Sequence, residues 1–478
     1  MFDKVNLRGS MMTQVPKIAK ELAKIVGRDR VFTNLEDRLC YAYDATFVEH
    51  LPDVVVKPAS TEEVARILEL AHREGIPIHP RGAGTGLSGG SVPLGGGIAL
   101  VMTEMREIRK IHREDMLAVV APGVVTAHLH RAAEACGLFY PPDPSSSEFC
   151  TIGGNVATGA GGPRGLKYGV TRDYVLGLEV VLADGSVIRT GGRTIKNATG
   201  YDLTRLFTGS EGTLGVITEI IVRLLPLPST VRTLLAVFKD LAQAGEAVTA
   251  ILTSGIVPRT LEIMDQISIA LVEKFSPCGL PLDAAAVLLI ETDGQKEQAE
   301  REAEEIHTLL TRQGAEVTLA KNPEEADKLW KARRAVSPAI AKIKPTKISE
   351  DVTVPRSQIP TMIRRLGEIR QKYNIDLVIF GHAGDGNLHP NIACDRRDQG
   401  EMRRVEQAIA EILNAALELG GTLSGEHGIG VLKAPFLLSD LGSGGWIAMK
   451  KIKQSLDPKG ILNPGKIFIE RSQELVKT

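Results

Sequence analysis

A glycine-dense loop near the N-terminus constrains the fold of this chain more than any other feature. Residues 81–90 read Arg-Gly-Ala-Gly-Thr-Gly-Leu-Ser-Gly-Gly and follow a short strand pattern at 76–80. Without side chains, successive backbone N–H groups can converge on an anion, which favours a pyrophosphate-binding loop over a simple tight turn. Residues 98–101 form another strand pattern instead of an amphipathic helix, and no Gly-Lys-Ser/Thr closes the loop. This argues against a Rossmann unit and against a P-loop.

A second glycine-rich block covers residues 141–169 and is expected to be poor in helix. A long run of small residues in a compact domain is usually functional, and here it suggests backbone lying against a large flat ligand. A flexible linker is the alternative, but its interspersed apolar residues, Ile152, Val156, Leu166 and Tyr168, are atypical of linkers.

Two further glycine-flanked segments concentrate histidines. A short strand pattern at 375–380 runs into Gly-His-Ala-Gly-Asp-Gly-Asn-Leu-His-Pro at 381–390, expected to form a turn, and Ser-Gly-Glu-His-Gly follows at 424–428. Imidazole and carboxylate together suit a divalent metal such as Zn, Mn or Fe. Two unrelated turns without a metal are the alternative.

Composition narrows the class of protein. The 478 residues suffice for two or three domains, and 57 basic against 58 acidic residues provide no basic field for nucleic acid. No apolar run approaches the roughly 18 residues that span a bilayer, and the first residues lack the apolar core of a secretory signal. Five scattered cysteines without a CxxC pair argue against an iron–sulfur cluster and favour a reducing cytoplasm.

Periodicity predicts alternating strands and helices. After Pro226–Pro228, taken as a domain junction, the pattern favours an α+β unit whose helices cover one face of a sheet. Helices are expected at 15–27, 60–75, 240–254, 294–313, 361–373 and 403–419, with a short helical segment at 329–334, and strands at 53–57, 175–182, 186–189, 233–238 and 286–291.

Eight ordered motifs then show a resemblance that spans about residues 40–468. They are RGAGTGLSGG, PPDPSSS, TIGGNVATGAGG, YGVTRDYVLGLEVVLADG, FTGSEGTLGVITE, GHAGDGNLHPNI, SGEHGIG and LDPKGILNPGK. In this order they resemble the FAD-linked D-2-hydroxyacid dehydrogenases, which include D-lactate dehydrogenase, D-2-hydroxyglutarate dehydrogenase and the catalytic glycolate oxidase subunit. The chain is therefore expected to be an enzyme that oxidises a 2-hydroxy acid, D-lactate or glycolate, to the 2-oxo acid.

The resemblance also implies an α+β architecture with a FAD-binding domain of the vanillyl-alcohol-oxidase type. We expect an N-terminal helical segment (1–46), the FAD-binding domain (47–228), a ferredoxin-like substrate domain (229–425) and a C-terminal segment that returns to the FAD (426–478).

The resemblance assigns a cofactor site, and because the loop carries Thr85 and no histidine, noncovalent FAD is expected. The expected FAD contacts are Pro80, Arg81, Gly82, Ala83, Gly84, Thr85, Gly86, Ser88, Gly89, Pro142, Asp143, Ser145, Gly153, Gly154, Asn155, Gly159, Gly162, Glu211, Gly215, Ile217, Asn463, Gly465 and Lys466.

The resemblance likewise implies the catalytic residues. His382, His389 and Glu426 are expected to hold the metal. His427 is expected to take the hydroxyl proton while hydride passes to the flavin. Arg333 is expected to bind the substrate carboxylate through its planar fork, with Arg334 solvated. Three other polar residues are expected to support the site: Asn387 and Ser337 at the substrate and Asp385 behind the histidines.

The reduced flavin needs an electron acceptor, and the sequence contains no motif for a second redox group. An electron-transferring flavoprotein, an iron–sulfur subunit, or a quinone or cytochrome route is implied by the resemblance. A homo-oligomer and membrane association through a partner remain compatible with the sequence. Three other functions stay open: a metal hydrolase, a noncatalytic flavin-carrying subunit, and an oxygen-using oxidase of the wider fold family.

Overall fold

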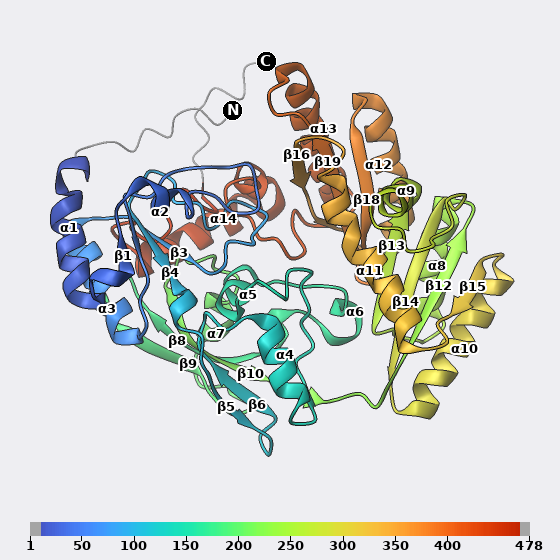
Figure 1. The fold of residues 1–478 in the computed structure, drawn as a ribbon, viewed down its shortest axis with the longest axis horizontal. Helices are drawn as coiled ribbons and strands as arrows, with labels where there is room; N and C mark the ends of the chain where they lie inside the picture. The colour runs from blue at the N-terminus through green and yellow to red at the C-terminus, as the bar shows by residue number, and fades with distance from the viewer. Residues whose placement is uncertain (1–10, 469–478) are drawn as a thin grey trace.

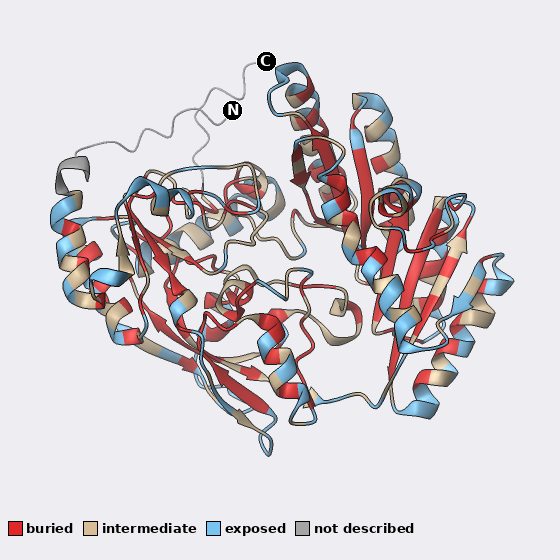
Figure 2. Ribbon diagram, viewed as in Figure 1, coloured by how far each residue is buried: buried red, intermediate tan, exposed pale blue. Residues whose placement is uncertain are grey.

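The computed structural model describes residues 11–468, so the parts of the predicted terminal segments at 1–10 and 469–478 lie outside it. An N-terminal unit, a second unit built on one large sheet, and a returning C-terminal helix make up the α+β fold (Figure 1). The central strands of both units are buried, while the edge strands at 187–191 and 316–319 and the outer faces of the helices are largely exposed (Figure 2). No helix within residues 11–468 is long and apolar enough to cross a membrane.

The first sheet of the N-terminal unit carries the glycine loop at the end of one strand. β2 (Val54–Val56), β4 (Ile98–Val101) and β3 (Ile78–Arg81) pair in parallel, and β1 (Val31–Phe32) adds an antiparallel edge. Helices α1 (Met11–Val26) and α3 (Thr61–Glu74) pack their apolar faces on the core of this sheet. The helix predicted at 60–75 is confirmed: Ser60 caps α3 by accepting the N–H of Glu63, and Gly75 ends the helix at a φ of 67°.

The second sheet of this unit is antiparallel, in the order β5-β6-β10-β8-β9. The two strands predicted at 175–182 and 186–189 form a hairpin, in which Ala183-Asp184-Gly185 joins β8 to β9. Small helices and the two-stranded β7–β11 ribbon cover the sheet and its end. The bounds are β5 (Ile108–His112), β6 (Leu117–Val120), α4 (Thr126–Glu134), β7 (Leu138–Phe139), β8 (Val175–Val181), β9 (Val187–Gly191), α7 (Leu203–Phe207), β10 (Val216–Arg223) and β11 (Leu225–Pro226).

The expectation that residues 141–169 are poor in helix is wrong for two stretches, α5 (Ile152–Thr158) and α6 (Gly165–Tyr168). Thr151 caps α5 by accepting the N–H of Gly154, and Gly159 ends it at a φ of 73°. Ile152 and Val156, one turn apart, anchor the helix in the core. A helix of seven residues shows too few apolar repeats to be recognised by periodicity.

The second unit is organised around an antiparallel sheet in the order β15-β12-β14-β13-β18-β19-β16, with β17 beside β19. The expectation that helices cover one face is incomplete. Helices α8, α10, α12 and α13 pack on one face, and α9 and α11 cover the other. The bounds are β12 (Thr230–Phe238), α8 (Leu241–Thr253), β13 (Thr260–Asp265), α9 (Gln266–Phe275), β14 (Ala286–Gly294), α10 (Lys296–Arg312), β15 (Glu316–Leu319), α11 (Pro323–Ile340), β16 (Thr346–Ser349), β17 (Val352–Thr353), α12 (Ile359–Tyr373), β18 (Asp376–His382), β19 (Asn387–Cys394) and α13 (Gln399–Glu418).

After α13 the chain returns to the N-terminal unit. The N–H of Val431 donates to the carbonyl of Ser88 at 2.8 Å, and Lys453 of α14 (Leu437–Leu456) donates to the carbonyl of Thr213 at 2.7 Å. Beyond α14, Ile461 accepts from the N–H of Ile78, and Asn463 donates back to the Ile78 carbonyl at 2.7 Å. The C-terminal segment therefore extends the sheet edge next to the glycine loop.

Candidate active site

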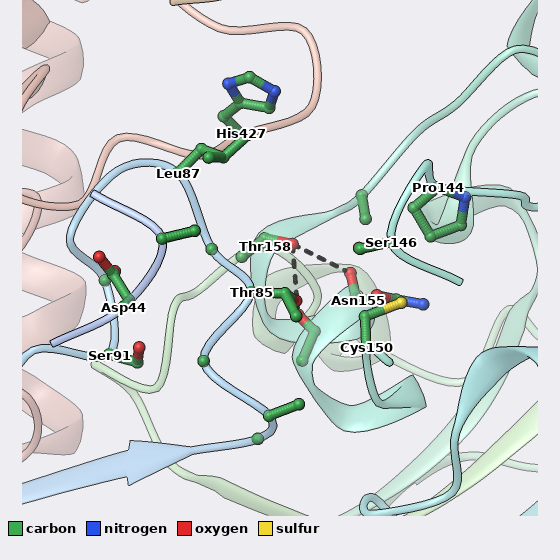
Figure 3. Close-up of a pocket in the computed structure, with 18 of the residues that line it drawn as sticks. Asp44, Thr85, Leu87, Ser91, Pro144, Ser146, Cys150, Asn155, Thr158 and His427 are labelled. Carbon is green, nitrogen blue, oxygen red and sulfur yellow. Dashed lines mark hydrogen bonds between the residues drawn. The ribbon is translucent and has the colours of Figure 1, made fainter. Parts of the chain in front are cut away.

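A cavity of about 580 Å³ lies where the N-terminal unit, the large sheet and the C-terminal loop meet. Figure 3 shows side chains from three parts of the chain around it: Thr85 from the loop after β3, Asn155 from α5, and His427 from the loop before α14. The volume is in the ordinary range for small-molecule and cofactor sites.

Most of the residues predicted to bind FAD line this cavity. They are Pro80, Arg81, Gly82, Ala83, Gly84, Thr85, Gly86, Ser88, Ser145, Gly153, Gly154, Asn155, Glu211, Gly215 and Ile217. Gly89, Pro142, Asp143, Gly159, Gly162, Asn463, Gly465 and Lys466 do not line it.

The glycine loop has its shape for backbone reasons. Gly84 has a φ of 74°, and a Cβ there would overlap the Arg81 guanidinium. That guanidinium is in turn held by the carbonyl of Tyr43 at 2.6 Å. A wall of glycine backbone with a buried cation behind it fits a flat cofactor that carries a pyrophosphate.

Two predicted cofactor residues support the loop from behind. Asn463 donates through Nδ2 to the carbonyls of Gly90 and Glu211, and Lys466 donates to the carbonyl of Val92. The Glu211 carboxylate accepts the N–H groups of Ile429 and Gly430 at 2.8 Å each, which ties the N-terminal unit to the C-terminal loop.

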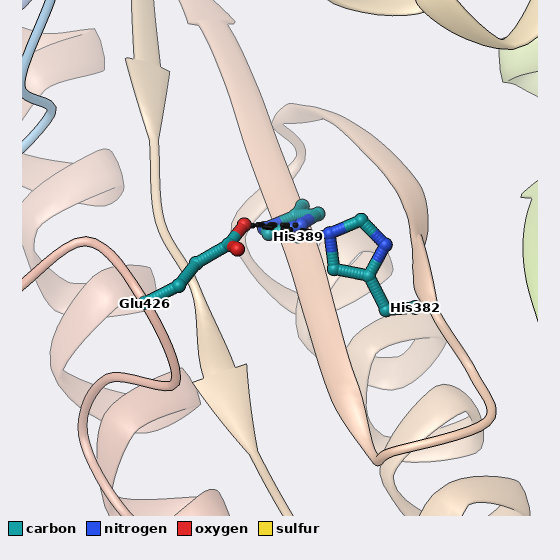
Figure 4. Close-up of side chains that lie close together, drawn as sticks. All are labelled: His382, His389 and Glu426. Carbon is teal, nitrogen blue, oxygen red and sulfur yellow. Dashed lines mark ion pairs between the residues drawn. The ribbon is translucent and has the colours of Figure 1, made fainter. Parts of the chain in front are cut away.

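Three predicted metal ligands converge beside the cavity, and two of them, His389 and Glu426, line it. One ligand atom from each of His382, His389 and Glu426 lies within 4.8 Å of the others (Figure 4). Glu426 Oε1 is 3.4 Å from His382 Nε2 and 3.3 Å from His389 Nε2. His389 lies on β19 and not in the turn where the sequence placed it, because the β18–β19 hairpin pairs it with Phe380.

Charges around these three residues favour a cation. Burial alone would raise the pKa of Glu426, but His382 and His389 hold it well below its usual value. Glu262 contacts the far nitrogen of His382 at 2.7 Å, which directs Nε2 toward Glu426. His382 Nε2 is buried and has no hydrogen-bond partner. Two imidazole nitrogens and a carboxylate in this arrangement fit a divalent metal ion.

His427 lies beside this cluster and lines the cavity. Its ring stacks on that of His389 with centroids 5.4 Å apart, and its Nδ1 is 3.3 Å from Oδ1 of Asp351. Burial lowers the pKa of His427 to about 4. The ring is therefore neutral at neutral pH and able to accept a proton.

The two adjacent arginines differ from expectation. Arg333 does not line the cavity: its Nη2 is 2.7 Å from Glu262, and its guanidinium lies over the Phe380 ring. Its Nε is buried without a hydrogen-bond partner. Arg334, which was expected to be solvated, lines the cavity.

Three polar residues of the cavity wall were not predicted from the sequence: Lys347, Ser349 and Asn391. Lys347 on β16 lines it and donates to Ser337 at 2.6 Å, and within residues 11–468 it forms no ion pair. Burial lowers the pKa of Lys347. Ser349 and Asn391 also line the cavity, and the Ser349 hydroxyl donates a hydrogen bond to Asn391 Oδ1 at 2.6 Å. Asn387, which was expected at the substrate, does not line it. In the sequence these positions show only a lysine, Lys347, among ordinary strand residues, and this pattern does not identify a site.

Comparisons with known proteins agree with this architecture. The family of FAD linked oxidases, C-terminal domain, matches residues 227–467, and the FAD binding domain family matches residues 52–191. The chain is 49% identical over 461 residues to "Glycolate oxidase subunit GlcD" of Bacillus subtilis, covering 96% of this chain and 98% of that protein. It is 36% identical to "D-lactate dehydrogenase" of Anaerostipes hadrus, covering 95% and 98%.

Solved structures support the fold. p-Cresol methylhydroxylase with substrate bound aligns with a TM-score of 0.81 at 20% identity, over 97% of this chain and 98% of that chain. Alkyldihydroxyacetonephosphate synthase aligns with a TM-score of 0.76 at 22% identity, over 96% and 87%.

Proposed function

The chain belongs to the FAD-linked oxidases of the D-lactate dehydrogenase and glycolate oxidase subunit type, and we propose that it oxidises glycolate or D-lactate to the 2-oxo acid. The family establishes FAD-linked 2-hydroxy acid oxidation. The observation that supports this substrate class is the set of side chains on the cavity wall. His427, two of the three candidate metal ligands (His389 and Glu426) and Lys347, which has no ion-pair partner within residues 11–468, line the same cavity.

FAD would bind noncovalently along the glycine loop, residues 81–90, and against α5. Bound FAD supplies the hydride acceptor. Glu211 and Asn463 hold the glycine loop against the C-terminal segment. These contacts fix the position of the cofactor-binding residues relative to His427. Thr85 stands where a covalent tether would require a histidine.

His382, His389 and Glu426 would hold a divalent ion such as Zn, Fe or Mn with open positions. Such an ion supplies Lewis-acid polarisation of a hydroxyl group. Glu262 fixes the His382 ring so that Nε2 is directed toward the other two ligands. The protein would thus contribute three ligand atoms, fewer than a closed structural site requires.

His427 accepts the hydroxyl proton, since burial keeps its ring neutral. Lys347 and Arg334 bind the substrate carboxylate, because they are the cationic groups on the cavity wall near Ser337. Arg333 and Asn387 do not line the cavity, and Arg333 instead pairs with Glu262, so neither is given a substrate contact in this proposal. Two cations at this end also suit a substrate with a second carboxylate, such as D-2-hydroxyglutarate.

Turnover would require an electron acceptor, which we propose to be a partner protein. Two relatives from different bacteria are named as subunits of glycolate oxidase, which supports a multi-subunit assembly for this chain. An electron-transferring flavoprotein or an iron–sulfur subunit is the expected acceptor, in the cytoplasm.

Steady-state assays with an artificial dye test the proposal. Glycolate, D-lactate and D-2-hydroxyglutarate are compared, with L-lactate as the stereochemical control and with a chelator. Turnover with dye, and little with oxygen, supports a dehydrogenase; rapid turnover with oxygen would show an oxidase. His427→Ala should stay yellow and lose roughly a hundredfold or more in kcat, and unchanged activity would remove His427 from the mechanism.

A further inference from the structure

The loop that presents Glu426 and His427 is wrapped around one buried carboxylate, that of Asp351. Asp351 lies between β16 and β17 and is fully buried. Its Oδ2 accepts the backbone N–H groups of Gly425 at 2.7 Å, Glu426 at 2.9 Å and His427 at 3.3 Å. Ser424 donates its hydroxyl to both carboxylate oxygens at 3.1 Å.

A buried lysine completes this arrangement. Lys433 is 1% exposed, and its Nζ contacts Asp351 Oδ1 and donates to the carbonyls of Asp351 and Leu423 at 2.7 and 2.8 Å. Burial would raise the pKa of Asp351, but His427 and Lys433 keep it below its usual value. Three backbone N–H groups, a hydroxyl and an ammonium group therefore fix the orientation of this carboxylate.

The two carboxylate oxygens differ in their partners. Oδ2 faces the three backbone N–H groups, whereas Oδ1 faces Lys433 and, 3.3 Å away, the Nδ1 atom of His427. That Nδ1 is buried, and the 3.3 Å contact is too poorly aligned to count as a hydrogen bond. Contacts of this kind are often long before the substrate binds and shorten in the complex.

We infer that Asp351 is the positioning residue for His427: its Oδ1 accepts the Nδ1–H of the imidazole and leaves Nε2 as the proton acceptor. This rests on the proposed role of His427 as the base. A carboxylate on one ring nitrogen fixes both the tautomer and the orientation of the ring, which is how buried aspartates assist histidine bases elsewhere. The Oδ2 contacts with the backbone would be enough to hold the shape of the loop. The contact of Oδ1 with the His427 ring is therefore the one that a positioning role explains.

The tautomer can be read directly on the wild-type holoenzyme. Selective ¹⁵N-histidine labelling reports which ring nitrogen carries the proton, and His427→Gln assigns the signal. The expected result is a neutral His427 protonated at Nδ1. Protonation at Nε2 with a bare Nδ1 would overturn the inference, because Asp351 could then accept nothing from the ring. This measurement needs no substrate and stands whether or not the proposed activity is found.

A double-mutant cycle tests the functional consequence. Flavin reduction is measured in single turnover for wild type, Asp351→Asn, His427→Ala and the double variant, each checked for bound FAD and thermal stability. Asp351→Asn should lower the rate about a hundredfold in the wild-type background and less than about twofold beside His427→Ala. Asp440→Asn is the matched control, because Asp440 accepts from Thr422 and Leu423 of the same segment without reaching His427.

The outcomes separate the two roles. Losses that multiply in the double variant would show that Asp351 acts through the loop and not through His427, and the inference would fail. If Asp351→Asn does not fold or does not hold FAD, the tautomer of the wild-type protein decides. If none of the 2-hydroxy acids reduces the flavin of the wild-type protein, the proposed function is refuted. The tautomer result is unaffected by that outcome.

Discussion

Replacing Lys347 by methionine should weaken catalysis without weakening the fold. Lys347 Nζ lies at the cavity wall, donates to Ser337 at 2.6 Å and forms no ion pair within residues 11–468. A charge-assisted hydrogen bond to a substrate carboxylate contributes about 1.5–3 kcal/mol. Its loss lowers kcat/KM about 10- to 150-fold.

The effect on stability has the opposite sign to that of most buried substitutions. Burial lowers the pKa of Lys347 in the folded protein. The charged form of this side chain is therefore less favourable in the folded protein than in the unfolded chain, where water solvates it. Between the two pKa values the unfolded chain binds more protons, and wild-type stability rises with pH in that window. Lys347→Met removes this dependence, and its melting temperature at neutral pH should equal or exceed that of wild type.

Lys344→Met is the matched control, three residues earlier. Lys344 pairs with Asp376 and Glu401 at 2.6 Å each, away from the cavity wall. Its loss should lower the melting temperature slightly and leave kcat/KM unchanged. Steady-state kinetics with glycolate and D-lactate, with thermal melts of the ligand-free proteins, measure both variants. An unchanged kcat/KM for Lys347→Met, or equal losses in both variants, would refute the role of Lys347.

Three further predictions concern the metal, the cofactor and the contact between units. His389→Ala should reduce bound divalent metal, measured by elemental analysis, while FAD content is retained; full metal content would exclude His389 as a ligand. Gly84→Val should weaken FAD binding at least about tenfold in a fluorescence titration, since a side chain at a φ of 74° overlaps the Arg81 guanidinium. Asp293→Asn should destabilise the protein by about 3–5 kcal/mol in denaturant unfolding, because buried Asp293 accepts from Lys167 at 2.6 Å and Tyr168 at 2.8 Å across the two units; a loss below about 1 kcal/mol would contradict this.

Elements with long apolar periodicity were predictable from the sequence. The helices α3, α8, α10, α12 and α13 lie where the spacing placed them, because each presents a continuous apolar stripe to a sheet. The helix α5 was not predictable, since seven residues bracketed by Thr151 and Gly159 show capping but hardly any period. The β18–β19 hairpin moved His389 from a turn into a strand for a tertiary reason: its register is set by pairing with β18.

Residue type located the site but could not orient its side chains. His382, His389 and Glu426 converge as expected, since the pattern of ligands was visible in the sequence. Arg333 and Arg334 are adjacent, and only the packing of α11 against Phe380 and Glu262 decides which of them faces the cavity. Asp351 and Lys433 lie in segments with no recognisable motif, so their convergence on the Glu426–His427 loop required the fold.

Anaerobic mixing of the FAD-loaded protein with substrate tests the central claim most directly. Glycolate or D-lactate should bleach the visible flavin absorbance in a single turnover, with stoichiometric formation of the 2-oxo acid. Deuterium at the substrate C2 should slow that bleaching, because hydride transfer to the flavin is the step observed. A flavin that stays oxidised with every 2-hydroxy acid, including D-2-hydroxyglutarate, would contradict the account.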